Sequence, residues 1–194
     1  MKTLAFAALA LVALTAGCSL PPDQQAVVDV EAYGGKVKLN PEGQVVEVDL
    51  SRTKAPDALV AALVALPKLQ SLNLSDTPIT GQGLDPLDAL PELQTLFLSG
   101  SQLDDAGLAH IEQLTALRTL HLGRTKITDA GLPALRHMTH LRTLSLGNTE
   151  ITDAGLGHLR NLRELATLVL HHTKVTKSGV DQLRRSLPDT QIDR

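Results

Sequence analysis

Two adjacent histidines near the end of the sequence could in principle bind a metal ion, and they have a simpler interpretation. His171 and His172 are adjacent, and imidazole is a zinc ligand, but no cysteine or spaced carboxylate lies near them to complete a zinc site. Neighbours on an extended strand point to opposite faces, so we expect two surface histidines. His110 and His158, which lie 48 residues apart, are interpreted as solvated helix surface.

A recurring aspartate raises calcium binding as a further possibility. Asp105, Asp129 and Asp153 follow one another at intervals of 24 residues. Calcium loops need several closely spaced oxygen ligands, whereas each interval supplies one carboxylate here. Acidic residues just before a helix interact favourably with its positive end, and we prefer this interpretation. The sequence therefore predicts no metal site and no cofactor.

Catalytic motifs are absent from the sequence. It contains no G-x-S-x-G, no phosphate-binding loop and no zinc motif, so we predict that the protein is not an enzyme. The chain carries 18 Lys and Arg against 21 Asp and Glu, a net charge of −3. Nucleic-acid-binding proteins usually have a basic footprint, so we expect no nucleic-acid partner.

The N-terminal residues have the features of an export signal. Lys2 precedes an apolar stretch, residues 4–16, which is too short to span a bilayer as a stable anchor. Cys18 is the only cysteine and cannot form an internal disulfide. Residues 14–18, LTAGC, resemble the lipobox of bacterial lipoproteins, with Thr15 where that family usually has Leu. The alternative is an ordinary signal peptide with a chance cysteine.

The lipobox resemblance implies that residues 1–17 are removed and that Cys18 becomes the acylated N-terminus. Several acyl chains would hold the protein at a membrane, since one chain alone binds only marginally. Ser19, rather than Asp, follows the cysteine. By resemblance to the enterobacterial sorting rule, this favours the outer membrane. We expect an exported, lipid-anchored protein of the bacterial cell envelope.

A 24-residue repeat organises the rest of the chain. Its skeleton, LxxLxLxxTxITDAGLxxL, is read from residues 117–135. Units of a repeat array bury their apolar faces on their neighbours, so we expect a long, thin core. Five copies open at Leu69, Leu93, Leu117, Leu141 and Leu165, and Val45 opens a sixth.

Each position of the repeat predicts a local structure. The L-x-L step is expected to be a strand with its leucines pointing inward. The threonine that follows can satisfy backbone groups where the strand ends. The repeated glycine indicates a positive φ or a close approach to a neighbour. Pro86 and Pro133 are expected early in short helices, because proline is tolerated only in the first turn. The threonine positions are 53, 77, 125, 149 and 173, with Ser101 in the third repeat, and the glycine positions are 83, 107, 131, 155 and 179.

These observations divide the chain into five parts. After the signal of residues 1–17, residues 18–25 form the lipidated cysteine and a tether. Residues 26–44 form an N-terminal cap, with a helix closed by Gly34 and Gly35 and a strand that pairs with the first repeat. The six repeats occupy residues 45–187, and residues 188–194 form a cap or a tail. We prefer a cap, because Ile192 could cover the last repeat.

Residues 45–187 resemble bacterial leucine-rich-repeat proteins of the 24-residue subtype. That resemblance implies an α/β fold: a curved right-handed solenoid with a parallel sheet on its concave face and short helices on its convex face. It also implies binding as the usual activity, without catalysis or a cofactor.

The exposed positions of the strands define a predicted partner surface that runs from acidic to basic. Aromatic and arginine side chains dominate interface energetics, so Phe97, Arg118 and Arg142 are the predicted anchors. The alternative is that each is an ordinary solvated strand residue. The predicted set comprises Asn73, Asp76, Phe97, Arg118, His121, Arg124, Arg142 and His171.

Two functions fit these predictions. The first is a membrane-tethered interaction module that binds a protein or a glycan of the cell envelope on its concave face. The second is a structural envelope protein that associates with itself, edge to edge or between its acidic and basic halves. A binding module should remain a monomer, which is the state that we favour, whereas self-association predicts oligomers of the purified protein.

Overall fold

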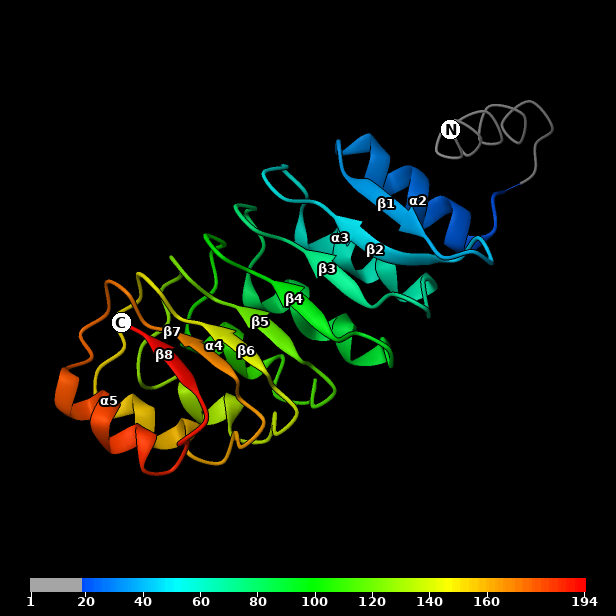
Figure 1. Cartoon of the computed structure of the whole chain (residues 1–194). Helices are drawn as coiled ribbons and strands as arrows, with labels where there is room; N and C mark the ends of the chain where they lie inside the picture. Colours follow the sequence, from blue (N-terminus) through cyan, green and yellow to red (C-terminus); the bar gives the residue numbers. More distant parts are fainter. Residues whose placement is uncertain (1–18) are drawn as a thin grey trace.

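An eight-stranded sheet runs the length of the computed structural model, which describes residues 19–194 (Figure 1). The strands lie side by side in the order in which they occur in the chain. The predicted signal and Cys18 lie outside the described residues. Within residues 19–194, no helix combines the length and the apolar character needed to cross a membrane.

Every repeat contributes one short strand and one short helical segment. The strands are β1 Lys36–Leu39, β2 Val45–Asp49, β3 Ser71–Asn73, β4 Thr95–Phe97, β5 Thr119–His121, β6 Thr143–Ser145, β7 Thr167–Val169 and β8 Gln191–Asp193. The α-helices are α2 Pro22–Ala32, α3 Asp57–Ala62, α4 Asp105–Ala109 and α5 Lys177–Arg184. The 3-10 helices are η1 Leu63–Ala65, η2 Gly81–Ala89, η3 Leu132–Leu135 and η4 Gly155–Leu159.

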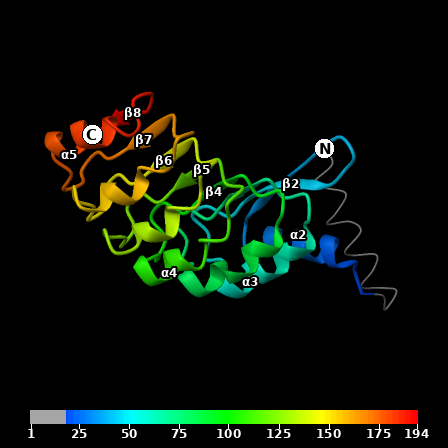
Figure 2. The same cartoon turned by 90° about the horizontal axis from the view of Figure 1, so that it is seen from below.

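The 24-residue period sets the register of the sheet. Strands β2 to β8 are parallel, and each residue pairs with its equivalent in the next repeat, as Leu72 does with Leu96 and Leu96 with Leu120. These leucines are fully buried, because alternate strand residues point to the same face. The sheet lies on the inner side of a shallow arc and the helical segments on its outer side (Figure 2). The predicted solenoid fold is confirmed.

The helical segments are shorter and more tightly wound than α-helices in several repeats. Pro133 is the second residue of η3, as predicted. Pro86, however, is the sixth of nine residues in η2, so its predicted place in a first turn is wrong. Proline in an α-helix removes an N–H and clashes with the carbonyl four residues earlier, and this segment is a 3-10 helix instead.

The repeated threonine closes the turn after each strand. Its hydroxyl donates to the carbonyl oxygen three residues earlier, at 2.6 to 2.7 Å, for Thr53, Thr77, Thr125, Thr149 and Thr173. The predicted structural role of the threonine is confirmed at these five positions. Ser101 is the exception, since its buried hydroxyl has no hydrogen-bond partner.

The repeated aspartate joins neighbouring repeats. Asp105 accepts hydrogen bonds from the backbone N–H and the hydroxyl of Thr128, at 2.7 and 2.6 Å. The same pair of bonds links Asp57 to Thr80, Asp129 to Thr152 and Asp153 to Thr176. The prediction that these carboxylates interact chiefly with a helix end is therefore incomplete, because each is held by the next repeat.

The repeated glycine is required by close approach rather than by a positive φ. A Cβ at Gly131 would lie 2.5 Å from the Asp105 carboxylate, and one at Gly155 would overlap that of Asp129. A positive φ occurs instead three residues after the end of each strand from β2 to β7. The residues there are Arg52, Asp76, Gly100, Arg124, Asn148 and His172, with φ between 56° and 72°.

The N-terminal helix begins earlier than predicted. Helix α2 starts at Pro22, four residues before the expected residue 26, because proline suits the first turn of a helix. The predicted tether of residues 18–25 is therefore partly helical. Gly34 ends this helix with a φ of 81°, and β1 pairs antiparallel with β2, as predicted.

The C-terminal residues form a cap strand. Strand β8 pairs in parallel with β7, and Ile192 packs against the core. The side chain of Arg194 donates to the carbonyl oxygen of Val175 at 2.7 Å, which ties the end of the chain to the last repeat. Of the predicted alternatives for residues 188–194, the structure shows the cap.

Candidate functional site

The concave face consists of two rows of side chains that point away from the core. The first row occupies the first outward position of each repeat strand and the second row lies two residues later. The first row is Glu47, Ser71, Thr95, Thr119, Thr143 and Thr167, and the second is Asp49, Asn73, Phe97, His121, Ser145 and Val169. Most of these side chains are small, so the face is smooth and a large side chain on it is exceptional.

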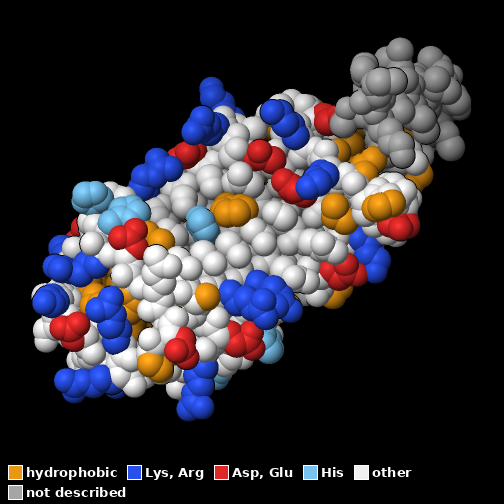
Figure 3. Space-filling view, viewed as in Figure 1, with side chains coloured by type: hydrophobic (Ala, Val, Ile, Leu, Met, Phe, Trp, Pro, Cys, Tyr) orange, Lys and Arg blue, Asp and Glu red, His pale blue; other side chains and the backbone are white. Residues whose placement is uncertain are grey.

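Phe97 and His121 form an aromatic pair near the centre of the face. They are in register on β4 and β5, their ring centroids are 4.8 Å apart, and the rings meet edge to face at 72°. Both residues are half-buried, and burial lowers the pKa of His121. Apolar and histidine side chains adjoin in the middle of this face in Figure 3.

A third position of each repeat lies beyond the pair, two residues after the strand ends. The residue after each buried leucine is small in five repeats, namely Ser51, Ser75, Ser99, Gly123 and Gly147. His171 occupies the sixth such position, and its ring nitrogen Nε2 would lie 2.7 Å from a Cβ at Gly147. The absence of a side chain at Gly147 therefore lets His171 lie across the face.

An ion pair occupies the next position along the repeat. Arg124 Nη2 lies 3.0 Å from Asp76 Oδ1, although the two residues are two repeats apart. Gly100 lies between them, and a Cβ there would overlap the Asp76 carboxylate and lie 3.3 Å from Arg124 Nη2. Both predicted partner-binding charges are therefore engaged with each other.

Asn73 is also engaged within its own repeat. Its side-chain oxygen accepts a hydrogen bond from the backbone N–H of Ser75 at 3.1 Å, and Asp49 does the same for Ser51 at 2.9 Å. Asn73 therefore shapes the turn after β3 while it lies beside Phe97 in the sheet.

Arg118 and Arg142 do not lie on the outward rows, so their predicted place on the concave strands is wrong. Each precedes its strand by one residue and lies at the amino margin of the sheet. Glu164 lies near both arginines. Its pKa is lowered first by a hydrogen bond with His140 and then by the charges of His140, Arg142 and Arg118. Arg142 Nε is 3.7 Å from Glu164 Oε2. The structure thus separates these arginines from Phe97 and His121.

The histidine pair also differs from its prediction. His171 and His172 lie beyond the end of β7, and the chain turns at His172, where φ is 56°. Their rings therefore meet edge to face at 5.5 Å instead of pointing to opposite faces. Within residues 19–194, no group of three or more His, Cys, Asp or Glu side chains could hold a metal ion.

Sequence reasoning missed the small residues that follow the outward rows. Gly123, Gly147 and Gly100 each sit at a fixed place in the repeat, so alignment of the six copies would have shown where side chains are missing. The left-handed position also went unpredicted, because five of its six residues are not glycine.

Models of leucine-rich-repeat families match the chain at residues 115–175 and 65–87. The chain folds as a leucine-rich-repeat solenoid. Internalin C2 of Listeria monocytogenes is similar to it, with 25% identity, a TM-score of 0.55, and coverage of 88% of this chain and 82% of the internalin. No curated protein matches the sequence.

Two further leucine-rich-repeat structures share the fold. A Leptospira interrogans leucine-rich-repeat protein is 22% identical, with a TM-score of 0.51, and the match covers 69% of this chain and 39% of that one. The Arabidopsis receptor kinase HAESA, solved with the peptide hormone IDA and the co-receptor SERK1, is 21% identical, with a TM-score of 0.60. That match covers 80% of this chain and 26% of HAESA.

Proposed function

We propose that this leucine-rich-repeat solenoid is a non-enzymatic interaction module, tethered to a membrane of the bacterial cell envelope through lipid on Cys18. Its ligand is a protein or a glycan that binds the concave face. The outer membrane is the favoured location, and the protein acts as a monomer. The proposed binding face lies within the described residues, whereas the proposed tether is inferred from the lipobox resemblance.

The observation that carries the proposal is the Phe97–His121 pair. Aromatic groups are enriched at binding hot spots, and this pair lies half-buried among small side chains. A ligand group placed over these small side chains would contact Phe97 and His121. The similarity to internalin C2 and to HAESA, which was solved with a peptide hormone, supports a binding role for this fold.

The charge distribution favours a second candidate function, self-association. Residues 19–110 contain 13 acidic and 5 basic side chains, whereas residues 111–194 contain 8 acidic and 12 basic ones. All seven histidines lie between residues 110 and 172. The acidic half of one copy is therefore complementary to the basic half of another, which is the basis of a structural role.

Affinity capture from envelope extract tests the binding face. Wild type is compared with Phe97→Ala/His121→Ala and with a control, His158→Ala/Arg160→Ala, whose exposed residues lie in and just after η4 on the outer side. We expect the control to retain a partner that the concave variant loses. Equal capture by all three proteins contradicts the concave-face assignment, and capture of the chain alone favours self-association. Light scattering then reports the oligomeric state.

A further inference from the structure

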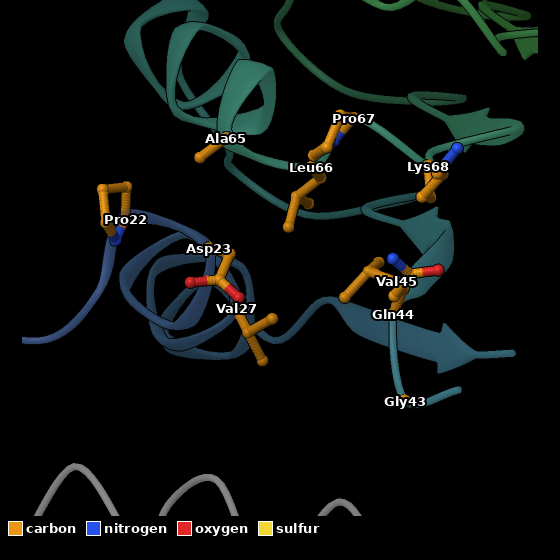
Figure 4. A pocket seen from close by; sticks show the side chains of 10 residues that line it. All are labelled: Pro22, Asp23, Val27, Gly43, Gln44, Val45, Ala65, Leu66, Pro67 and Lys68. Carbon is orange, nitrogen blue, oxygen red and sulfur yellow. The ribbon is translucent and has the colours of Figure 1, made fainter. Parts of the chain in front are cut away.

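An apolar cavity opens beside the N-terminal cap. It lies between α2, the turn that joins β1 to β2, and the segment after η1 (Figure 4). Its volume is about 410 Å³, within the range of small-molecule sites. Val27, Val45 and Leu66 form its walls, and all three are buried members of the core. The cavity is therefore an opening in the apolar interior.

The polar groups at the mouth of the cavity give little basis for an ionic ligand. Lys68 is one of two charged residues that line it, and its ammonium group donates to Glu92 Oε1 at 2.5 Å. The other, Asp23, is an exposed residue in the first turn of α2. The interior of the cavity thus offers mainly apolar contacts, which suit a hydrocarbon chain.

The cavity lies where the described chain begins. Pro22, the first residue of α2, lines it, and the helix is closed there by a hydrogen bond from Gln25 N to Pro21 O at 2.9 Å. Four residue steps separate Cys18 from Pro22, and an extended chain of that length spans at most about 14 Å. A substituent on Cys18 therefore starts within reach of the mouth.

Two exposed apolar side chains lie at the same end of the molecule. Among residues 19–194, the large hydrophobic residues that remain exposed are Tyr33 and Val64, at 43% and 38%. Tyr33 follows α2 and Val64 belongs to η1, next to Ala65 in the cavity wall. The end of the solenoid at which the described residues begin is thus the end best suited to a lipid surface.

We propose that this cavity takes one fatty acyl chain carried by Cys18, an inference that rests on the lipid anchor of the proposed function. An acyl chain in the cavity would bury its own apolar surface and that of the wall, which removes both from water. The other acyl chains remain free to enter the bilayer. A chain held in the cavity would keep the N-terminal cap at the membrane and direct the solenoid away from it.

Photochemical cross-linking tests the proposal on the full protein made by bacterial cells. The cells are supplied with a fatty acid that carries a diazirine near the end of its chain. Mass spectrometry of the purified protein first reports whether Cys18 carries the acyl group. Irradiation after detergent removal should then attach that group to the peptides that contain Val45 or Leu66.

Neighbouring residues provide a matched pair of variants. Ala65→Phe places a ring in the cavity and should abolish most of the cross-link while Cys18 stays labelled. Val64→Phe places the same ring at an exposed position outside the cavity lining and should leave the cross-link unchanged. Ala65→Leu replaces Ala65→Phe if the latter melts below the wild type.

The outcomes separate the cavity from the anchor. A labelled Cys18 with no cross-link to the cavity peptides, or a cross-link undiminished by the filling variant, overturns the cavity and leaves the anchor in place. An unlabelled Cys18 overturns the anchor and the cavity proposal with it.

Discussion

The carboxylate of Asp129 holds Thr152 of the next repeat by two hydrogen bonds, at 2.8 Å from the backbone N–H and 2.5 Å from the hydroxyl. Gly155 packs against the same carboxylate. Adjacent repeats are therefore joined by polar bonds as well as by leucine packing. We call each aspartate–threonine pair of this kind a clamp. Because the stability of a solenoid is roughly a sum of repeat and interface contributions, each clamp should have a measurable effect on the free energy of unfolding.

Removal of the clamp should destabilise the protein. For Asp129→Ala we expect the free energy of unfolding to fall by about 2 kcal/mol, because one hydrogen bond to a charged group contributes about 1.5–3 kcal/mol and solvent weakens this partly buried pair of bonds. Urea unfolding followed by circular dichroism measures the change. The control is Glu150→Ala, which removes an exposed ion pair with Lys174 between the fifth and sixth repeats and should cost less than about 1 kcal/mol. Equal losses in the two variants would show that the clamp contributes little.

Two glycines of one helical segment should respond to alanine in opposite directions. A Cβ at Gly155 would overlap Asp129 and lie 2.8 Å from Leu132, so Gly155→Ala should cost about 1–3 kcal/mol. Gly157 has open space around it and no positive φ, so Gly157→Ala should stabilise the protein by about 0.4–1 kcal/mol. Thermal melts of both variants check the signs. A shared sign would contradict the packing argument.

The unpaired hydroxyl of Ser101 should be a weak point of the third repeat. Burial of an unsatisfied hydroxyl costs about 1–3 kcal/mol, so Ser101→Ala should raise the free energy of unfolding by about 1 kcal/mol. Thr149→Ala at the equivalent position should lower it by a similar amount, since the Leu146 carbonyl oxygen loses its donor. Parallel urea curves compare the two. A loss of stability in both variants would mean that the Ser101 hydroxyl is satisfied in solution.

His121 should make stability depend on pH. Burial lowers its pKa in the folded state below the ordinary value of about 6.5, so the unfolded chain binds a proton first as the pH falls. Stability is therefore full above about pH 6.5 and declines through the interval down to the folded pKa. His121→Gln should lose less stability than the wild type between pH 7.5 and pH 5. Parallel pH profiles of the two proteins would contradict this assignment.

The third repeat shows where the repeat pattern was an incomplete guide. Gly81 and Asp104 replace the aspartate and threonine of the clamp, and Gly81 instead packs directly on Gly107. Asp104 accepts from the N–H of Gly107 at 2.8 Å and so caps α4. Each substitution is visible in the printed sequence. Its consequence is not, because it depends on what the neighbouring repeat places opposite.

The sequence alone determined the solenoid, the inward leucines, the threonine bonds and the in-register sheet. These features recur every 24 residues, and a repeat that buries its leucines on an identical neighbour has one consistent register. The Phe97–His121 contact follows from the same register.

Only the tertiary structure decided how the remaining side chains of the candidate site are arranged. It paired Asp76 with Arg124 across Gly100, left Arg118 and Arg142 at the amino margin, and opened the cavity beside α2. Such contacts depend on the distance between side chains in different repeats and on where the chain leaves each strand. The pattern of residues within one repeat specifies neither that distance nor that point, so these relationships appear only when the repeats are stacked.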